Sequence, residues 1–312
     1  MRIGVIGLGR MGGGIARRLR AADIDCVLHD NNPQLAAFAS EVDAEWAAST
    51  AALVAALDDE NPRVVWVMVP AGDVTTNVVR ECARHMGAGD VIIDGGNSYF
   101  RDTVALSQEL AQAGVHLVDS GTSGGLRGEQ IGYCLMVGGA DEDIEALAPV
   151  FNALSDPTPD GRGFVHCGAV GSGHYTKMIQ NGIEYGMMQS FAEGFALLRR
   201  ADAAQSEFDI DLASVAQAWR KGSVVESWLL ELLADALHQD QDLSGFTGSV
   251  PDSGTGRWTV NTALDTATPA HVLTAALLQR FESRLEDNYG NKVLSALRAG
   301  FGGHTEQQLF KG

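Results

Sequence analysis

Three polar residues in one segment have the types and spacing needed for acid–base chemistry: Lys177, Asn181 and Glu184. If the segment is a helix, Asn181 lies about 40° and Glu184 about 20° around its axis from Lys177. One face then presents a titratable amine, an orienting amide and a titratable carboxyl. Such a face can remove one proton from a bound molecule and return another. We predict these three as catalytic residues.

The alternative interpretation of this segment is a polar stripe that faces solvent, which is the common case for an arbitrary helix. Two features argue against it. Gly171 and Gly173 open the segment and permit close approach of backbone. The remaining residues are too apolar for a surface helix, which indicates that the polar face lines a cleft.

A glycine-rich turn near the N-terminus, residues 7–12, has the spacing Gly-x-Gly-x-x-Gly. It follows the apolar run 2–6 and opens a stretch of helical periodicity, and Asp30 ends the next apolar run. In that context the pattern indicates a dinucleotide site. The glycines permit a tight turn, close approach to the pyrophosphate and close helix–strand packing, and the helix N-terminus faces the phosphates. A glycine turn without a ligand is the weaker alternative.

Asp30 also bears on the choice of cofactor. A carboxylate there accepts hydrogen bonds from ribose hydroxyls and repels a 2′-phosphate. The next residues, Asn31 and Asn32, supply no cation for that phosphate. We therefore predict NAD, with NADP disfavoured. A nearby positive nicotinamide also favours the neutral amine of Lys177, and so its use as a base.

Two further glycine-rich loops could bind anions or polar groups. Residues 119–125 combine successive backbone N–H groups with the hydroxyl of Ser123, which makes an anion-binding concavity. Residues 95–98 follow the apolar run that ends at Asp94, so they lie at the carboxyl edge of a sheet, where ligands bind. Ordinary turns are the alternative for both.

The elements that must position these residues change in type along the chain. Seven short apolar runs alternate with helical stretches such as 75–85 and 101–113. The runs are residues 2–6, 26–29, 64–69, 91–94, 116–119, 134–138 and 164–167. This alternation predicts an α/β fold, a parallel, doubly wound Rossmann-type sheet covered on both faces.

From residue 171 onward the pattern is helical. The predicted helices are 172–200, 212–237, 269–285 and 288–300, with a long glycine-rich loop over 240–262. We predict a dinucleotide-binding domain over 1–168, followed by an all-helical domain for substrate binding and oligomerisation over 169–312.

Composition excludes several classes of protein. With 22 Lys and Arg against 40 Asp and Glu, the net charge is −18, which opposes binding to nucleic acid or to an anionic membrane. The four cysteines form no CxxC pair, and no His/Asp/Glu spacing indicates a metal. The apolar run at the N-terminus is too short for a signal peptide. We expect reduced thiols and a cytoplasmic protein.

The sequence resembles the 6-phosphogluconate dehydrogenases, the decarboxylating enzymes of the pentose phosphate pathway, over nearly the whole chain. The resemblance rests on six motifs: GLGRMG at 7–12, DGGNS at 94–98, SGGLRG at 123–128, GSGHYTKMIQNGIEYG at 171–186, GTGRWT at 254–259 and LRAGFGGH at 297–304. It implies that Lys177 removes the proton of the substrate 3-hydroxyl during oxidation. It also implies that a 3-keto acid then loses CO2 and that Glu184 protonates C1 of the resulting enediol.

The resemblance also implies a set of binding residues. For the cofactor these are Gly7, Leu8, Gly9, Arg10, Met11, Gly12, Asp30, Val69, Pro70, Ala71 and Asn97. For the substrate they are Asn97, Ser123, Gly124, Gly125, Gln180, Asn181, Tyr185, Arg257, Arg280, Arg298 and His304. Ser123, Gly124 and Gly125 would hold the carboxylate, Asn97 and Asn181 the hydroxyls, and Tyr185, Arg257 and Arg280 the phosphate. Arg298 and His304 match tail residues that the family supplies from a neighbouring subunit.

Two positions depart from the family pattern. Gln180 stands where the family usually has His, so it can form hydrogen bonds but cannot carry a proton. Arg257 stands where many members have Lys, and its planar fork still suits a phosphate. The chain also lacks the duplicated second helical block of the long members. We therefore expect an obligate oligomer with interleaved helical domains.

Two other functions compete with this one. The first is a β-hydroxyacid dehydrogenase of the same architecture that acts on a small unphosphorylated acid without loss of CO2. The second is a non-catalytic NAD-sensing protein, against which the intact set of Lys177, Asn181 and Glu184 argues.

Overall fold

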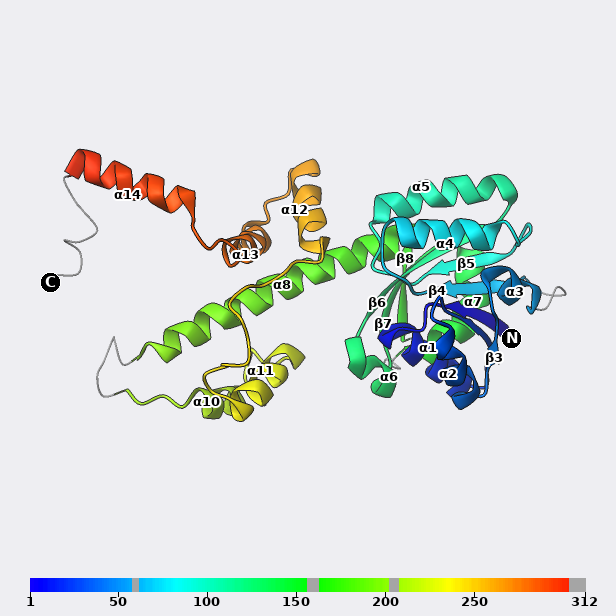
Figure 1. The fold of residues 1–312 in the computed structure, drawn as a ribbon, viewed down its shortest axis with the longest axis horizontal. Coiled ribbons are helices and arrows are strands. Elements are labelled where there is room, and N and C mark those ends of the chain that lie inside the picture. The colour runs from blue at the N-terminus through cyan, green and yellow to red at the C-terminus, as the bar shows by residue number, and fades with distance from the viewer. Residues whose placement is uncertain (58–61, 156–162, 202–207, 303–312) are drawn as a thin grey trace. The chain divides into compact units, whose positions relative to one another are not determined.

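Short, mostly apolar runs between residues 2 and 168 form an eight-stranded sheet in the computed structural model (Figure 1). The structure describes residues 1–57, 62–155, 163–201 and 208–302. These fall into two units, Met1–Gln180 and Asn181–Gly312. The sheet belongs to the first unit.

The order of the strands is β3-β2-β1-β4-β5-β6-β7-β8, with β1 at the point where the order reverses. A crevice at such a switch point, outside the carboxyl ends of the strands, is where open α/β sheets bind nucleotides. The strands are β1 Arg2–Ile6, β2 Asp25–His29, β3 Glu45–Trp46, β4 Val64–Val67, β5 Val91–Asp94, β6 His116–Ser123, β7 Cys134–Gly138 and β8 Phe164–Gly168.

Helices cover both faces of the sheet, because successive side chains of a strand point to opposite sides. In β4, Val64 and Trp66 enter one apolar cluster and Val65 and Val67 enter the other. The helices of this unit are α1 Arg10–Ala21, α2 Ala36–Glu41, α3 Thr50–Ala55, α4 Asp73–Ala83, α5 Phe100–Leu110, α6 Gly128–Ile131 and α7 Asp141–Leu154. Helices α1, α2 and α7 pack on the first face, and α3, α4 and α5 on the second. The predicted α/β, doubly wound class is confirmed.

The prediction of a wholly parallel sheet is wrong at one pair of strands. β6 and β7 run antiparallel, with Asp119 opposite Gly138 and Ser123 opposite Cys134. The link between them holds only the four-residue helix α6 and a 3-10 turn, Gly125–Arg127. A parallel crossover requires a dozen or more residues, so the chain turns back instead. The two-residue strand β3 is too short for periodicity to reveal it.

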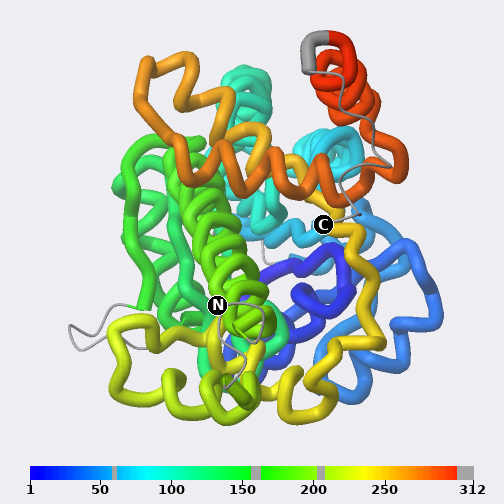
Figure 2. Tube along the Cα trace, turned by 90° about the vertical axis from the view of Figure 1, so that its left-hand side faces the viewer, coloured from blue at the N-terminus to red at the C-terminus, as the bar shows by residue number. Residues whose placement is uncertain are grey.

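Helix α8, Ser172–Arg199, runs without a break from the first unit into the second (Figure 1). The second unit then holds helices alone within its described residues: α10 Leu212–Trp219, α11 Trp228–Gln239, α12 Thr255–Asp265, α13 His271–Glu282 and α14 Tyr289–Gly302. Helices α10 and α11 lie side by side (Figures 1 and 2). The helical character predicted after residue 171 is confirmed.

Two boundaries in the second unit differ from the prediction. The single helix predicted over 212–237 is two helices, because Gly222 takes φ +76° and Ser227 caps α11 by accepting a hydrogen bond from the Leu230 N–H. The loop predicted over 240–262 ends earlier, because α12 begins at Thr255, directly after Gly254 with φ +94°.

The core of the second unit is small. It is formed by Phe195 of α8 with residues of α10 and α11, among them Leu212 and Leu230. Many large apolar side chains stay exposed, including Leu197 at 76%. This much exposed apolar surface on the second unit is typical of a protein–protein interface.

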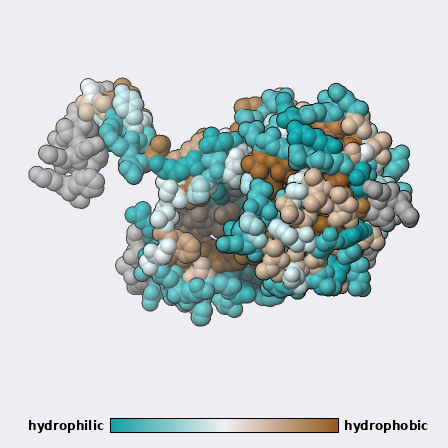
Figure 3. Space-filling model, turned by 45° about the vertical axis from the view of Figure 1, so that its right-hand side comes forward, coloured by the Kyte–Doolittle hydropathy of each residue, from teal (hydrophilic) through white to brown (hydrophobic). Residues whose placement is uncertain are grey.

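Figure 3 shows one face of the molecule, on which the broadest hydrophobic patches lie over the sheet-containing unit.

Candidate active site

The glycine-rich turn between β1 and α1 has the geometry of a phosphate-binding loop. Gly7 takes φ +91°, and a Cβ on Gly12 would lie 1.8 Å from the Gly7 carbonyl oxygen. A Cβ on Gly9 would meet nothing within 4 Å, so it would project into open space. Helix α1 begins at Arg10 with no side chain capping its first N–H groups. Its N-terminus therefore offers free donors to an anion.

Asp30, at the end of β2, lies directly beside this turn. Its carboxylate accepts hydrogen bonds from the Leu8 N–H at 2.7 Å and from the Asn32 N–H at 2.8 Å. A pocket of about 290 Å³ opens here. It is lined by Ile6, Gly7, Gly9, His29, Asp30, Asn31, Thr50, Met68, Val69, Pro70, Val74 and Val78. None of these described lining residues is Arg or Lys, so the carboxylate dominates the charge of this pocket.

The loops after β4 and β5 lie next to each other beside the same pocket. Val69 and Pro70 line it, and Ala71 follows them as an exposed residue. A Cβ on Gly96 would approach the Val69 carbonyl oxygen to 3.2 Å, which shows how closely the two loops meet. Asn97 is exposed at the tip of the second loop. The glycine turn, Asp30 and these loops therefore fit a dinucleotide across the carboxyl edge of the sheet.

Lys177 occupies a buried polar position within the first unit. Its side chain is only 8% exposed. Its Nζ donates a hydrogen bond to Gln180 Oε1 at 2.5 Å, and Gln180 Nε2 donates to Ser123 Oγ at 3.0 Å. Glycine is required at 121, because a Cβ there would lie 2.4 Å from the Cβ of Lys177. These two hydrogen bonds connect the predicted base, Lys177, through Gln180 to the loop predicted to bind a carboxylate.

A buried carboxylate from β6 fixes the start of the helix that carries Lys177. Asp119 is fully buried and accepts hydrogen bonds from the N–H groups of Gly171 at 2.5 Å and His174 at 2.7 Å. Burial raises the pKa of Asp119, and its neighbour His174 together with these two N–H groups opposes the rise. The carboxylate satisfies donors that the first turn of α8 leaves unpaired.

Helix α8 is continuous across positions 177, 181 and 184, so the helical premise of the prediction is confirmed. Asn181 and Glu184 are partly buried. Ile183, on another face of the helix, is 51% exposed. The catalytic roles of these residues stay a prediction.

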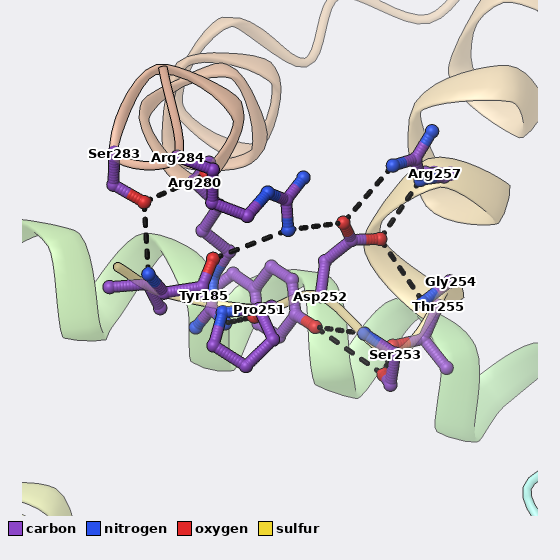
Figure 4. A network of polar contacts seen from close by, with 11 residues as sticks. Tyr185, Pro251, Asp252, Ser253, Gly254, Thr255, Arg257, Arg280, Ser283 and Arg284 are labelled. Carbon is purple, nitrogen blue, oxygen red and sulfur yellow. Dashed lines mark hydrogen bonds and ion pairs between the residues drawn. The ribbon is translucent and has the colours of Figure 1, made fainter. Parts of the chain in front are cut away.

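The second unit gathers the residues predicted to bind a phosphate around the segment 250–255 (Figure 4). The guanidinium of Arg280 lies 3.6 Å above the ring of Tyr185 and donates to the Pro251 carbonyl at 2.7 Å. The Tyr185 hydroxyl accepts from the Ser253 N–H at 3.3 Å. Arg257, in the first turns of α12, is half exposed. The structure therefore brings Tyr185, Arg257 and Arg280 to one short segment.

Two charged residues of this cluster escaped the sequence prediction. Asp252 accepts hydrogen bonds from both Arg257 and Arg284 (Figure 4). The Arg257 guanidinium, and then that of Arg284, hold the pKa of Asp252 at about 2 although burial opposes the shift. A signal for Arg284 existed, since the helix predicted over 269–285 places it one turn after Arg280, although α13 itself ends at Glu282.

Three other predicted residues, Gly124, Gly125 and Arg298, make none of the contacts described above, and one lies outside the described residues. Gly124 and Gly125 take φ +124° and +51° in the turn after β6, and Gly125 is exposed. Arg298 is exposed on α14. His304 lies outside the described residues. Among the residues that the structure does describe, no three His, Cys, Asp or Glu side chains gather as a metal site requires.

All four cysteines fall within the described ranges, and none is in a disulfide. Burial raises the pKa of Cys26 and of Cys82 to about 12, so these two thiols are unreactive. Cys134, in contrast, is exposed. In the part of the chain that the structure describes, no helix is long and apolar enough to cross a membrane.

Comparisons with known protein families match both units of the chain. Residues 2–171 match the model described as the NAD binding domain of 6-phosphogluconate dehydrogenase. Residues 173–299 match the model described as 6-phosphogluconate dehydrogenase, C-terminal domain.

Individual proteins agree with these matches. The chain is 41% identical over 305 residues to a 6-phosphogluconate dehydrogenase of Haloferax volcanii named as NAD(+)-dependent and decarboxylating, covering 97% of this chain and 98% of the relative. It is 39% identical to a putative 6-phosphogluconate dehydrogenase of Bacillus subtilis, covering 99% of this chain and all of the relative. The fold is similar to 6-phosphogluconate dehydrogenase of Plasmodium falciparum, with a TM-score of 0.80 and 24% identity. That comparison covers 97% of this chain and 65% of the Plasmodium chain.

Proposed function

Because the chain belongs to the 6-phosphogluconate dehydrogenase family, we propose that it converts 6-phosphogluconate to ribulose 5-phosphate and CO2, with NAD as the preferred cofactor. This is an oxidative decarboxylation of the pentose phosphate pathway. The observation that carries the proposal is the buried Lys177, which is hydrogen-bonded through Gln180 to Ser123. A buried amine beside an anion-binding loop supports proton transfer on a bound sugar acid.

The cofactor supplies one part of the chemistry, since bound NAD accepts the two electrons removed from C3 of the substrate. In the proposal, Gly7, Gly9 and Gly12 admit its pyrophosphate and Asp30 binds its ribose hydroxyls. The space beside Gly9 and the carboxylate at the end of β2 support this fit. The absence of Arg and Lys among the described residues that line the pocket supports NAD over NADP.

Lys177 acts twice in the proposed reaction. As a neutral amine it takes the proton of the substrate 3-hydroxyl while C3 is oxidised. As an ammonium it then donates a hydrogen bond to the new C3 carbonyl, which stabilises the negative charge that develops on oxygen when CO2 leaves. A β-keto carboxylate needs no metal for this step, because the carbanion delocalises into the ketone.

Glu184 completes the reaction by donating a proton to C1 of the enediol. Ser123, Gly124 and Gly125 hold the substrate carboxylate, and Asn97 and Asn181 bind hydroxyls. Gln180 forms hydrogen bonds with Lys177 and Ser123, but an amide takes no part in proton transfer. Tyr185, Arg257 and Arg280 bind the phosphate through charge-assisted hydrogen bonds.

The proposal includes an oligomer of at least two chains. On α8, Ile183, Met187 and Leu197 are 51%, 40% and 76% exposed, and on α14 Leu294 and Leu297 are 61% and 57% exposed. Apolar residues at this density on two helices support their burial by another copy. Arg298 and His304 would then complete the site of the neighbouring subunit. Light scattering tests this, because a fully active protein with the mass of one chain contradicts it.

We keep the domain division proposed from the sequence, with the nucleotide domain over 1–168 and the helical domain over 169–312. We also place the enzyme in the cytoplasm, a proposal that the four unpaired thiols support. A cell fractionation that finds the native protein outside the cytoplasm would contradict the second point.

One assay tests the proposed reaction. The purified protein is incubated with 6-phosphogluconate and with NAD or NADP in parallel, while reduced cofactor and released CO2 are measured. The expected result is one CO2 for each cofactor reduced and a higher kcat/KM with NAD. Reduction without CO2 would instead support the alternative, a non-decarboxylating β-hydroxyacid dehydrogenase. The absence of any turnover would support a non-catalytic NAD-binding protein.

A further inference from the structure

Asp252 is a nearly buried carboxylate of the second unit with three hydrogen-bonding partners. Its side chain is only 5% exposed. It accepts from Arg257 Nε at 2.9 Å and from the Arg257 terminal nitrogen at 3.1 Å, and Arg284 donates to it at 3.0 Å. The N–H of Gly254 adds a fourth bond at 3.3 Å. One carboxylate therefore connects α12 to the turn directly after α13 through the two guanidinium groups of Arg257 and Arg284 (Figure 4).

Each of these two guanidinium groups also contacts the aromatic ring of Phe281. Arg257 lies 4.4 Å and Arg284 lies 5.4 Å from the centre of the Phe281 ring. Arg284 also donates to the carbonyl of Val250 at 3.3 Å. Long arginine side chains lose considerable rotamer freedom when they are held in this way. Asp252 and Phe281 therefore hold both arginine side chains in place before an anion binds, which lowers the entropy cost of binding.

The charge of the cluster fits a phosphate monoester. Three guanidinium groups, those of Arg257, Arg280 and Arg284, oppose the one carboxylate of Asp252, which leaves 3 − 1 = +2. A phosphate monoester carries roughly −1.5 to −2 at neutral pH. Arg257 and Arg284 remain 52% and 31% exposed, so both can reach a ligand from solvent. Each also has five N–H donors, more than the carboxylate uses.

We propose that Asp252 is a positioning residue that orients Arg257 and Arg284, and that Arg284 is an additional phosphate-binding group that favours phosphorylated sugar acids over unphosphorylated ones. This inference rests on the proposed function, because it assigns these residues to the same substrate. It predicts that neutralising Asp252 weakens the binding of the phosphate, which is the opposite of what charge alone predicts. A carboxylate beside an anion site repels the anion, so charge alone predicts tighter binding once Asp252 is neutral. Loss of orientation predicts weaker binding.

The first test is Asp252→Asn, which keeps the size of the side chain and removes its charge. KM for 6-phosphogluconate should rise about tenfold or more, since the charge-assisted bonds from Arg257 and Arg284 weaken. The kcat should stay within about threefold, because the chemistry lies elsewhere. Asp287→Asn is the matched control, since it makes the same charge change at an exposed ion pair with Lys292. An unchanged or lower KM in Asp252→Asn would overturn the positioning role.

Folding must be separated from positioning in this comparison. The thermal midpoint of each variant reports whether it is folded. The KM for NAD should stay unchanged in a folded variant, because the nucleotide loops belong to the first unit. If Asp252→Asn does not fold, Arg284→Lys carries the same test. It keeps the charge of Arg284 and removes its planar fork, so a KM for 6-phosphogluconate equal to that of the wild type would overturn the inference.

The second test is Arg284→Ala with two substrates. KM for 6-phosphogluconate should rise about tenfold, while kcat/KM for gluconate, which has no phosphate, should not change. Inhibition by inorganic phosphate should weaken by the same factor. If the wild type prefers 6-phosphogluconate and Arg284→Ala keeps that preference in full, this inference fails and the proposed function stands. If the wild type shows no preference for the phosphorylated acid, the proposed function fails, and inorganic phosphate binding to the variants still decides the role of Asp252.

Discussion

Gly173 decides how close helix α8 can approach the sheet, and its replacement by Ala gives a sharp test of the proposed catalytic geometry. A Cβ at this position would lie 2.3 Å from the Met136 carbonyl oxygen and 2.9 Å from that of Asp119. Both oxygens belong to strands β7 and β6, which cannot yield as a flexible side chain would. A carbon–oxygen contact needs about 3.3 Å. The start of α8 must therefore move outward by about 1 Å.

Lys177 lies one helical turn after Gly173 and must move with it. A displacement of about 1 Å at a reacting group costs on the order of 100-fold in rate. Overpacking costs about 1–3 kcal/mol, and the higher helix propensity of Ala offsets about 1 kcal/mol of this. Gly173→Ala should therefore remain folded with only a modest loss of stability.

Gly194→Ala is the matched control, because it makes the same change in the same helix. A Cβ on Gly194 meets nothing within 4 Å. This control should keep its kcat and gain about 0.5–1 kcal/mol of stability.

Steady-state assays with 6-phosphogluconate and NAD, together with thermal unfolding, measure both effects. Gly173→Ala should lower kcat about 100-fold while KM for NAD stays unchanged, since the glycine turn near the N-terminus is untouched. A folded Gly173→Ala protein with a kcat within twofold of wild type would refute the argument that the position of Lys177 on α8 controls the reaction. An equal loss of kcat in Gly194→Ala would refute it as well, since that site has no contact to disturb.

Three further predictions follow from other parts of the structure. Lys177→Met should lower kcat by at least about 100-fold, because it removes the proposed base. NAD affinity by fluorescence titration should stay the same, and a kcat near wild type would exclude Lys177 as the base. Asp30→Ser combined with Asn31→Arg should raise the ratio of kcat/KM for NADP to that for NAD by at least about tenfold, and an unchanged ratio would show that Asp30 does not select the cofactor. Because the pKa of Asp252 is lowered from 3.8 to about 2, its contribution to stability is complete above about pH 4 and is lost as the pH falls towards 2. Acid unfolding followed by tryptophan fluorescence should be less steep in this range for Asp252→Asn, and identical curves would contradict the pKa shift.

Local residue patterns predicted the elements of this chain well where they are strongly periodic. The run at Val64–Val67 was visible because a strand buried on both faces is apolar at every position. The glycine turn was visible because a Cβ at Gly7 or Gly12 would meet backbone too closely, at 2.3 Å and 1.8 Å. The reversal of β7 was not visible, since apolar composition does not encode the direction of a strand.

The predicted site residues divide in the same way. The spacing of Lys177, Asn181 and Glu184 follows from helical periodicity, which the continuous helix α8 bears out. The contact of Gln180 with Ser123 required the structure, because it joins residues that are 57 positions apart.

The sequence by itself determined the α/β class, the glycine turn with its acidic partner, and the membership of a dehydrogenase family, because each depends on neighbours along the chain. Only the tertiary structure decided that Asp252 connects Arg257 with Arg284, and that β6 and β7 run in opposite directions. Those features arise where separate helices and strands meet, and a carboxylate accepts from whichever guanidinium groups packing brings within about 3 Å of it.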